Sequence, residues 1–350
     1  ASRSVNGPQD ARFPSGGNSM VLFRGRKSLL ATGHTLASKG KQFQIKLSNR
    51  QEIVSPWIGG LLAGLEGSSR LRRADISVRL EELPHGVMDI DGDAMWRNLV
   101  QIAEADGPTV TIPDICNRID RDLPITFLKR HMGTRGPLLS TIHGAKGQEA
   151  DRVLLMLPGR PDSNEGNIDW DEEARILYVG ATRARNELMV GSRRAGYMRK
   201  SKNDRSWRGR PKDFSAEVGL PGDVSIQATP DQKPDLQQIE AAAHELLSFG
   251  EKPVPAFADR DKNTGIYGIF VDKDATSSAI CLGHLTDQFI EDLAAIADCD
   301  IVDLPERLDG FSIMGSSTVV WRLENGARGD CGVALAPILN GFAQIAIGGN

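Results

Sequence analysis

Two short stretches of this chain combine glycines, hydroxyl groups and charged side chains at close spacing. Residues 140–151 read STIHGAKGQEAD, and residues 172–185 read EEARILYVGATRAR. In the first stretch, Gly144 and Gly147 allow the backbone to turn tightly and approach a ligand closely, and Lys146 adds a charge that attracts phosphate. In the second, arginines end a helical pattern. An arginine on a rigid helix can stabilise charge on a phosphoryl group, although such arginines are usually only solvated.

A third stretch is strongly basic. Residues 193–212, RRAGYMRKSKNDRSWRGRPK, contain nine Lys and Arg residues, one acidic residue, and the rings of Tyr197 and Trp207. Such a stretch could follow a phosphate backbone and stack a base, with Arg199 and Trp207 as the contacts. It could equally be a solvated linker between domains, as runs of charge usually are. If it neutralises phosphates, affinity for nucleic acid should fall steeply with salt.

The charge of the whole chain is unevenly distributed. The formal net charge of −4 divides into +2 for residues 1–192, +8 for residues 193–212 and −14 for residues 213–350. The acidic last part is therefore expected to dock a protein partner rather than nucleic acid. No apolar run of 18 residues and no signal-peptide pattern occurs, which excludes a predicted spanning helix. Four scattered cysteines favour the cytoplasm, and the spacing of the histidines predicts no metal site.

The residues around the first two stretches alternate between strands and helices. The patterns predict strands at 19–24, 42–47, 138–142, 152–157 and 187–190, and helices at 27–39, 52–65 and 171–185. This alternation predicts an α/β fold built on a parallel sheet.

Two further parts are predicted outside this sheet. Residues 67–137 are more polar, and their spacing predicts helices at 94–105 and 112–121. The last part has helical patterns at 235–249 and 285–297, and strand patterns at 265–271, 278–282, 311–314 and 318–323. It is therefore expected to be an α+β domain with a core of its own.

Residues 140–151 and 172–185 together resemble motifs V and VI of superfamily 1 DNA helicases of the UvrD/Rep type, in the family's order. The start MVLFRGR and the later RQEIVSPWIGGLLAGL resemble the opening of the family's second RecA-like domain. The resemblance covers about residues 19–66 and 138–191. The residues GQEAD resemble the helicase IV branch of the family most.

The resemblance implies a domain plan. Residues 19–66 and 138–192 would form the second motor lobe (2A-like, P-loop NTPase-type), with residues 67–137 inserted as a small helical subdomain (2B-like). A flexible start (1–18), a basic linker (193–215) and the acidic α+β accessory domain (216–350) complete the plan.

Carried over residue by residue, the resemblance also implies a site. Arg183 matches the arginine finger that reaches the γ-phosphate, and Glu149, beside Gly147, matches the contact to the nucleotide ribose. Thr141 and His143 match positions beside the DNA backbone that relay the state of the nucleotide. Lys146 and Arg24 are expected to touch DNA phosphates, Arg185 to serve phosphate or the helix dipole, and Tyr178 to pack in the core.

The sequence lacks two parts of a complete motor. It contains neither a G-x-x-x-x-G-K-[ST] loop nor an acidic segment for magnesium at the end of an apolar strand. The expected function is therefore the C-terminal portion of an ATP-dependent 3′→5′ DNA helicase, with a role in DNA repair. Alone the chain should be inactive, because ATP and Mg²⁺ need the first RecA-like lobe. Single-stranded or partly duplex DNA is the expected partner, with no membrane. The alternative is a helicase-derived module that binds DNA or protein without turnover.

Overall fold

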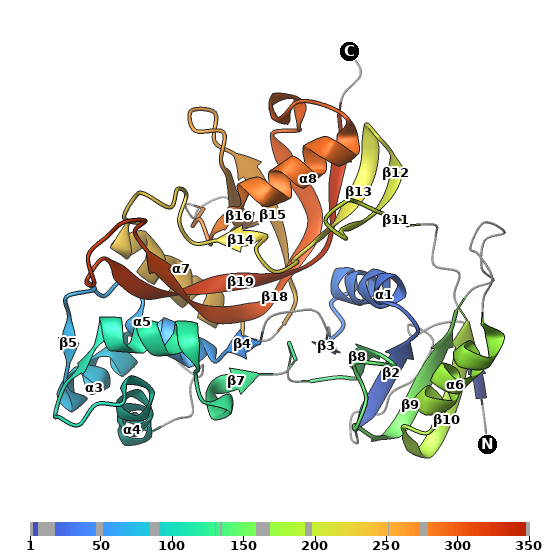
Figure 1. Cartoon of the computed structure of the whole chain (residues 1–350), viewed down its shortest axis with the longest axis horizontal. Helices are drawn as coiled ribbons and strands as arrows, with labels where there is room; N and C mark the ends of the chain where they lie inside the picture. Colours follow the sequence, from blue (N-terminus) through green and yellow to red (C-terminus); the bar gives the residue numbers. More distant parts are fainter. Residues whose placement is uncertain are drawn as a thin grey trace.

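The computed structural model describes residues 3–5, 18–46, 52–84, 91–129, 131–133, 135–158, 169–192, 198–250, 252–272 and 279–347. A parallel sheet lies at one end of the molecule, a group of short helices lies at the other, and a large antiparallel sheet rests on both (Figure 1). Of the predicted flexible start, the structure describes Asn18 and a strand at Arg3–Val5. Among the described helices, none has the length and apolar character that a membrane crossing requires.

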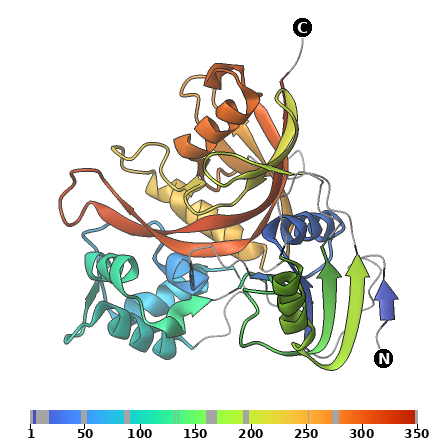
Figure 2. The same cartoon turned by 45° about the vertical axis from the view of Figure 1, so that its right-hand side comes forward.

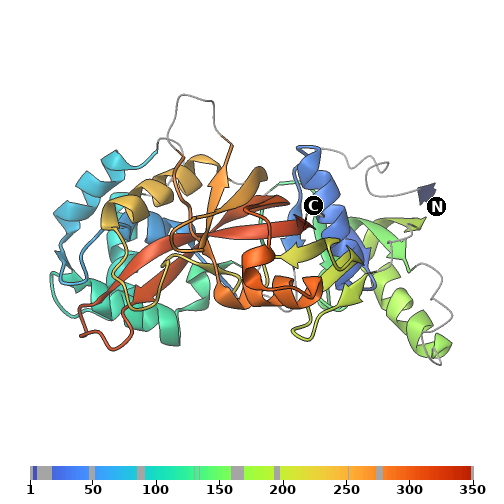
Figure 3. The same cartoon turned by 90° about the horizontal axis from the view of Figure 1, so that it is seen from above.

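Six parallel strands form the first sheet, in the order β1-β10-β9-β2-β8-β3. They are β1 (Arg3–Val5), β2 (Ser19–Phe23), β3 (Gln44–Lys46), β8 (Leu138–Thr141), β9 (Ala150–Leu157) and β10 (Ala184–Ser192). Helix α1 (Arg26–Ser38) and helix α6 (Trp170–Ala181) lie on opposite faces of the sheet (Figure 3).

The side chains of β2 explain this sandwich. Val21 and Phe23 pack in the cluster that contains Leu29 of α1, whereas Met20 and Leu22 pack in the cluster beside α6. Because successive residues of a strand point to opposite faces, a strand covered on both faces must be apolar throughout. The predicted α/β fold is confirmed as a parallel sheet covered by helices, which is the RecA-like arrangement.

Short helices follow the first part of this lobe. They are α2 (Pro56–Leu62), α3 (Arg73–Glu82), α4 (Gly92–Ala103) and α5 (Ile112–Arg121), with a single 3-10 turn at Ile125–Phe127. Two small ladders accompany them: β4 (Ile53–Val54) with β7 (Leu128–Lys129), and β5 (Arg70–Leu71) with β6 (Val110–Thr111). The two predicted helices are confirmed as α4 and α5. Helix α3 was not predicted, because it buries only Ile76 and has little apolar periodicity.

The antiparallel sheet has nine strands in the order β11-β12-β13-β19-β18-β15-β16-β17-β14. They are β11 (Arg199–Lys200), β12 (Ser206–Arg210), β13 (Asp213–Val218), β14 (Val224–Ser225), β15 (Val254–Arg260), β16 (Tyr267–Val271), β17 (His284–Leu285), β18 (Arg307–Arg322) and β19 (Cys331–Ala346). The two predicted helices of this part, α7 (Leu236–Ser248) and α8 (Asp287–Ala297), pack on it, and a 3-10 turn lies at Ile301–Asp303. The strand predicted at 278–282 is wrong, because its described residues 279–282 form no strand.

The basic stretch differs from the expected linker. Its described part, from residue 198 onward, forms β11, β12 and the start of β13 at one edge of the antiparallel sheet. The rest, with Tyr197, lies outside the described residues. The stretch can join a sheet because Trp207 and Phe214 supply buried side chains beneath its charged ones.

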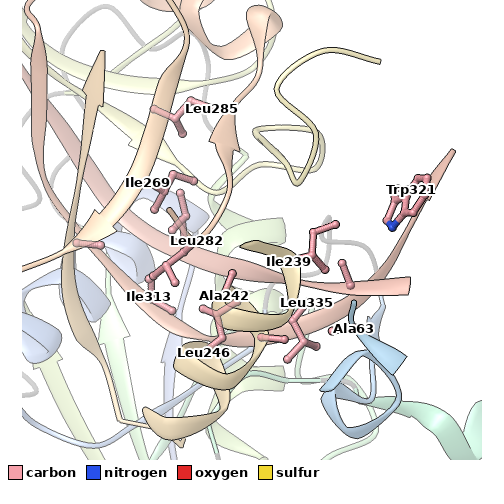
Figure 4. Close-up of a cluster of buried hydrophobic side chains, with 14 of the residues drawn as sticks. Ala63, Ile239, Ala242, Leu246, Ile269, Leu282, Leu285, Ile313, Trp321 and Leu335 are labelled. Atoms are coloured by element: carbon pink, nitrogen blue, oxygen red, sulfur yellow. The ribbon is translucent and has the colours of Figure 1, made fainter. Parts of the chain in front are cut away.

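The sequence predicted that the acidic domain has a core of its own, but the structure shows a core shared with the helical part. One hydrophobic cluster contains Ile58 and Leu61 of α2, Ile115 of α5, and also Ile239 of α7 and Leu335 of β19. Figure 4 shows α7 and β19 side chains meeting beside the end of α2. The helical part and the antiparallel sheet are therefore expected to fold together, since neither buries its apolar face alone.

Replacement of Gly59 by alanine tests this shared core. Gly59 lies in α2, and a Cβ there would come within 2.5 Å of Leu335 Cδ2 and 2.6 Å of the Ala334 carbonyl oxygen in β19. Alanine normally stabilises a helix relative to glycine by about 1 kcal/mol, but this overpacking should instead cost about 1–3 kcal/mol of unfolding free energy. Urea unfolding of Gly59→Ala measures the loss. Gly107→Ala, where a Cβ meets nothing within 4 Å, is the control.

Candidate nucleotide and DNA site on the parallel sheet

The carboxyl ends of β2 and β8 form one edge of the site. Phe23 ends β2 and Thr141 ends β8, and the Ile142 N–H donates to the Phe23 carbonyl at 2.9 Å. The Thr141 side chain is buried, and its Oγ1 accepts a hydrogen bond from the Gly144 N–H at 3.0 Å. This bond turns the chain away from the sheet and leaves His143 exposed at the turn. Thr141 therefore shapes the edge, and His143 is accessible from it.

Arg24 lies at the same edge, directly after β2. Its Nε and Nη2 atoms donate to the Glu173 carboxylate at distances of 2.7–3.0 Å, and Glu173 lies in the first turn of α6. The hydrogen bond between them raises the pKa of the Arg24 guanidinium and lowers the pKa of the Glu173 carboxyl. Arg24 is still 42% exposed. A phosphate at this edge would therefore compete with Glu173 for Arg24.

Glu149 and Arg183 lie together at the opposite edge, where β9 and β10 begin. The Ala150 N–H donates to the Arg183 carbonyl at 2.9 Å, and the exposed Glu149 carboxylate accepts a hydrogen bond from Arg185 Nε at 3.0 Å. The Asn18 side chain, just before β2, donates to the Glu149 carbonyl at 3.3 Å, which fixes this position at the amino end of the sheet. The two residues predicted to contact nucleotide are thus neighbours.

The Arg183 guanidinium is folded back on its own helix. Its Nε donates to the Val179 carbonyl at 2.9 Å, and its Nη2 donates to Thr182 Oγ1 at 3.2 Å. The Val179 carbonyl also accepts a hydrogen bond from Thr182 Oγ1 at 2.9 Å, so it keeps a partner when the guanidinium leaves. To reach a ligand, the guanidinium has to leave these two acceptors, which are exposed and can bond to water instead.

Residues 142–149 join the two edges across the α6 face of the sheet. Ile142 and Ala145 are buried in the cluster beneath α6. Lys146 is exposed between them and the amino end of the sheet, where Glu149 lies. Two glycines permit this path. A Cβ on Gly144 would lie 2.9 Å from Ser140 Oγ, and Gly147 has a φ of +77°, which favours glycine. His143 and Glu149 are therefore close in sequence but lie at opposite edges of the lobe.

Helix α6 leaves apolar side chains exposed. Tyr178 is 71% exposed and Trp170 is 66% exposed, so the prediction that Tyr178 packs in the core is wrong. The sequence held a signal for this: the run from Ile176 to Ala181 is apolar around the whole helix, although only one face can pack on the sheet. Large exposed apolar groups of this kind mark an interaction surface.

Trp207 is not available to stack a base, which corrects that part of the prediction. It is only 9% exposed, and its ring packs edge-on against Phe214 at a centroid distance of 6.0 Å. The Arg199 guanidinium lies over the ring, 4.9 Å from its centroid. A DNA contact by the exposed Arg199 stays a prediction.

Within the described ranges, no group of three or more His, Cys, Asp and Glu side chains is arranged to hold a metal ion. The residues of the second edge are instead suited to a nucleotide, because a carboxylate accepts hydrogen bonds from sugar hydroxyls and an arginine donates to phosphate.

Comparisons with known proteins agree with the geometry. A parallel sheet covered by helices on both faces has the architecture of a RecA-like lobe. Residues 136–194 match the family model of the UvrD-like helicase C-terminal domain. The ATP-dependent DNA helicase Rep of Escherichia coli (strain K12) is 28% identical over 193 residues, which are 51% of this chain and 26% of that protein. No solved structure matches significantly. Over these residues the chain is thus similar to the C-terminal half of UvrD/Rep-type superfamily 1 helicases, and the predicted resemblance is confirmed.

Proposed function

We propose that this chain is the second motor lobe, with its accessory parts, of an ATP-dependent DNA helicase. In this proposal it supplies the arginine finger, the ribose contact and the grip on single-stranded DNA. A first RecA-like lobe of the same protein supplies the phosphate loop and the magnesium site, so the chain alone does not turn over ATP. The 3′→5′ direction and a role in DNA repair rest on the resemblance alone.

The observation that carries the proposal is the pairing of residues at the two edges. Glu149 and Arg183 meet at the amino end of the sheet, and Thr141 and His143 lie at the carboxyl end. Residues 142–149 connect the two ends and are anchored in the core at Ile142 and Ala145. A shift of this segment caused by nucleotide at one edge would reach the DNA edge directly.

The residues act in the following way. Bound ATP and Mg²⁺ supply the phosphoryl group and neutralise part of its charge. Glu149 exchanges Arg185 for the hydroxyl groups of the ribose. Arg183 leaves the Val179 carbonyl and donates to the γ-phosphate oxygens, where charge develops in the transition state. Gly147 lets the backbone pass close to the nucleotide.

The exposed face of α6 supports the proposed partner lobe. Trp170, Ala174 and Tyr178 are spaced four residues apart and are exposed along one side of the helix. Arg183 follows the end of this helix, so a lobe that covers Tyr178 also meets the finger. ATP bound between the two lobes would then be closed off from water.

The DNA grip can be tested on the chain itself. The variant His143→Ala should bind a single-stranded oligonucleotide about 5–10-fold more weakly, as expected for the loss of one hydrogen bond of about 1 kcal/mol. Fluorescence anisotropy with a labelled oligonucleotide measures the affinity. His244→Ala, in α7 of the antiparallel part, is the matched control. Equal affinity of the His143 variant and the parent chain would remove His143 from the site.

A further inference from the structure

The edge of the antiparallel sheet formed by β11, β12 and β13 carries an excess of exposed positive charge. Residues 198–213 include six exposed cations but only two exposed carboxylates, Asp204 and Asp213. The cations are Arg199, Lys200, Lys202, Arg208, Arg210 and Lys212. This excess contrasts with the acidic character of residues 213–350 as a whole.

The strand register divides these cations between two faces. Trp207 faces the hydrophobic cluster with Phe214, and Arg199 lies opposite Trp207 in the ladder. Side chains alternate along a strand, so Arg208 and Arg210 lie on the other face. Arg208 Nε donates to Ser215 Oγ at 3.1 Å.

This second face is open to solvent at its outer end. The ladder rows there are Arg208–Ser215–Gln344 and Arg210–Asp213–Ala346. In these two rows all residues except Ser215 are exposed. Lys202 lies in the turn between β11 and β12 and is exposed as well. We call Lys202, Arg208 and Arg210 the basic edge. Over the described part of the chain, none of the three forms an ion pair, although Asp213 opposite Arg210 offsets part of the charge.

The turn that carries Lys202 lies beside the carboxyl edge of the parallel sheet, and Arg208 and Arg210 extend away from this turn along β12. Arg26, the first residue of α1, donates from Nη2 to the Asp204 carbonyl at 2.7 Å and to the buried Glu217 carboxylate at 3.1 Å. Lys27 Nζ donates to the Met198 carbonyl at 2.6 Å. Arg26 is two residues after Arg24. These bonds therefore hold the turn of the hairpin formed by β11 and β12 next to the carboxyl ends of β2 and β8. Figure 2 shows the hairpin above α1.

The side chains of the basic edge are better suited to duplex DNA than to single-stranded DNA. Proteins that bind single strands combine cations with exposed rings on which bases stack. The described residues of the hairpin offer no exposed ring, because Trp207 and Phe214 are buried. Cations without rings suit the duplex backbone, which carries one charge per about 1.7 Å of helix axis.

We propose that the basic edge docks the backbone of duplex DNA, next to the point where a single strand enters the carboxyl edge of the parallel sheet. This inference rests on the proposed helicase function and extends it. It assigns the duplex contact to Lys202, Arg208 and Arg210, in place of the predicted contact by Trp207. Contact is made to phosphates only, so binding is independent of DNA sequence.

The test compares duplex and single-stranded DNA on one variant. Lys202→Gln/Arg208→Gln/Arg210→Gln should bind a blunt duplex of 20 base pairs at least tenfold more weakly at 100 mM salt. The slope of log K against log salt for the duplex should become shallower by about 0.9 for each lost phosphate contact. Affinity for a 20-nucleotide single strand should change less than twofold. Anisotropy titrations at several salt concentrations measure all three quantities.

Two controls make the outcome decisive. Arg97→Gln/Lys252→Gln/Lys262→Gln removes the same charge from exposed positions elsewhere and should leave duplex binding intact. Arg210→Glu, at an exposed position at the end of β12, keeps the test valid if the triple variant does not fold. Unchanged duplex affinity in these variants, or an equal loss for both forms of DNA, overturns the proposal. If instead His143→Ala leaves single-strand affinity unchanged while the duplex loss is seen, the assigned grip fails and the basic edge stands.

Discussion

Replacement of Arg183 by alanine should abolish ATP hydrolysis by the motor that this chain completes. When a first RecA-like lobe is present, with DNA bound, the expected loss in kcat is about 10³–10⁵-fold, the range that an arginine finger contributes. The structure shows why the loss should fall on kcat rather than on folding. Among the described residues, the guanidinium donates to the Val179 carbonyl and to Thr182 Oγ1, both at exposed positions where water can replace it. Steady-state ATPase assays on the reconstituted pair of lobes, or on the full-length protein, measure the effect.

Arg185→Ala is the matched control for this experiment. Arg185 lies two residues further on, is 61% exposed and donates to Glu149 at 3.0 Å. Its loss frees the carboxylate that we assign to the ribose, so KM for ATP should change by a few-fold at most and kcat should be retained. Arg183→Lys keeps the charge but not the forked geometry and should recover little activity. If Arg183→Ala hydrolyses ATP as fast as the parent protein, Arg183 is not the finger.

The parallel lobe could be predicted because its signals are local. Strands β2, β8 and β9 contain short apolar runs, and α6 has acidic residues at its start. The adjacency of Glu149 and Arg183 is different, because it depends on β9 and β10 being neighbours. The sequence shows only that each residue precedes a strand. Which strands pair is decided by tertiary packing, so the motif resemblance, and not the periodicity, predicted that the two residues share a site.

The long hairpin of β18 and β19 was predicted only in part: the predicted strands at 311–314 and 318–323 fall in β18, whereas β19 was missed because residues that normally end strands lie inside it. Pro337 and Gly341 interrupt the pattern of β19. In the structure Pro337 lies opposite Ser316, where the register shifts, and Gly341 has a φ of +141° opposite Phe311, beside a second shift. Bulges accommodate such residues and bend the strands. The bend lets β18 and β19 reach from the sheet edge formed by β11, β12 and β13 to the helical part. A bulge depends on both strands, so neither strand reveals it alone.

Arg205 shows a second limit of prediction from sequence, because it lies in a basic run that was interpreted as solvated. Its side chain is 2% exposed. Its guanidinium donates to both oxygens of Asp223 at 2.8 and 2.9 Å, to Asp292 of α8 at 2.9 Å, and to the Glu217 carbonyl at 2.8 Å. It also lies 4.5 Å from the centre of the Phe289 ring. Burial alone would lower the pKa of Arg205, but hydrogen bonds to the two aspartates outweigh it and raise the pKa.

Arg205→Met should therefore be strongly destabilising. Methionine keeps much of the side-chain volume but leaves Asp223 and Asp292, whose side chains are 3% and 5% exposed, without their buried cation. Breaking a buried pair in this way costs about 3–5 kcal/mol, which is a large share of the 5–15 kcal/mol or so that stabilises a typical domain. The loss should appear as a lower midpoint in urea unfolding.

Arg208→Met separates burial from the mere loss of an arginine. Arg208 lies three residues further along the chain, in β12, but is exposed, so its replacement should change the unfolding free energy by about 0.5 kcal/mol or less. Adding Asp223→Asn and Asp292→Asn to Arg205→Met should recover part of the stability, because the amides carry no charge that needs a partner. If Arg205→Met unfolds at the same urea concentration as Arg208→Met, the buried ion group does not hold β12, α8 and the 219–223 turn together. The hairpin would then be held against the sheet by the packing of Trp207 and Phe214 alone.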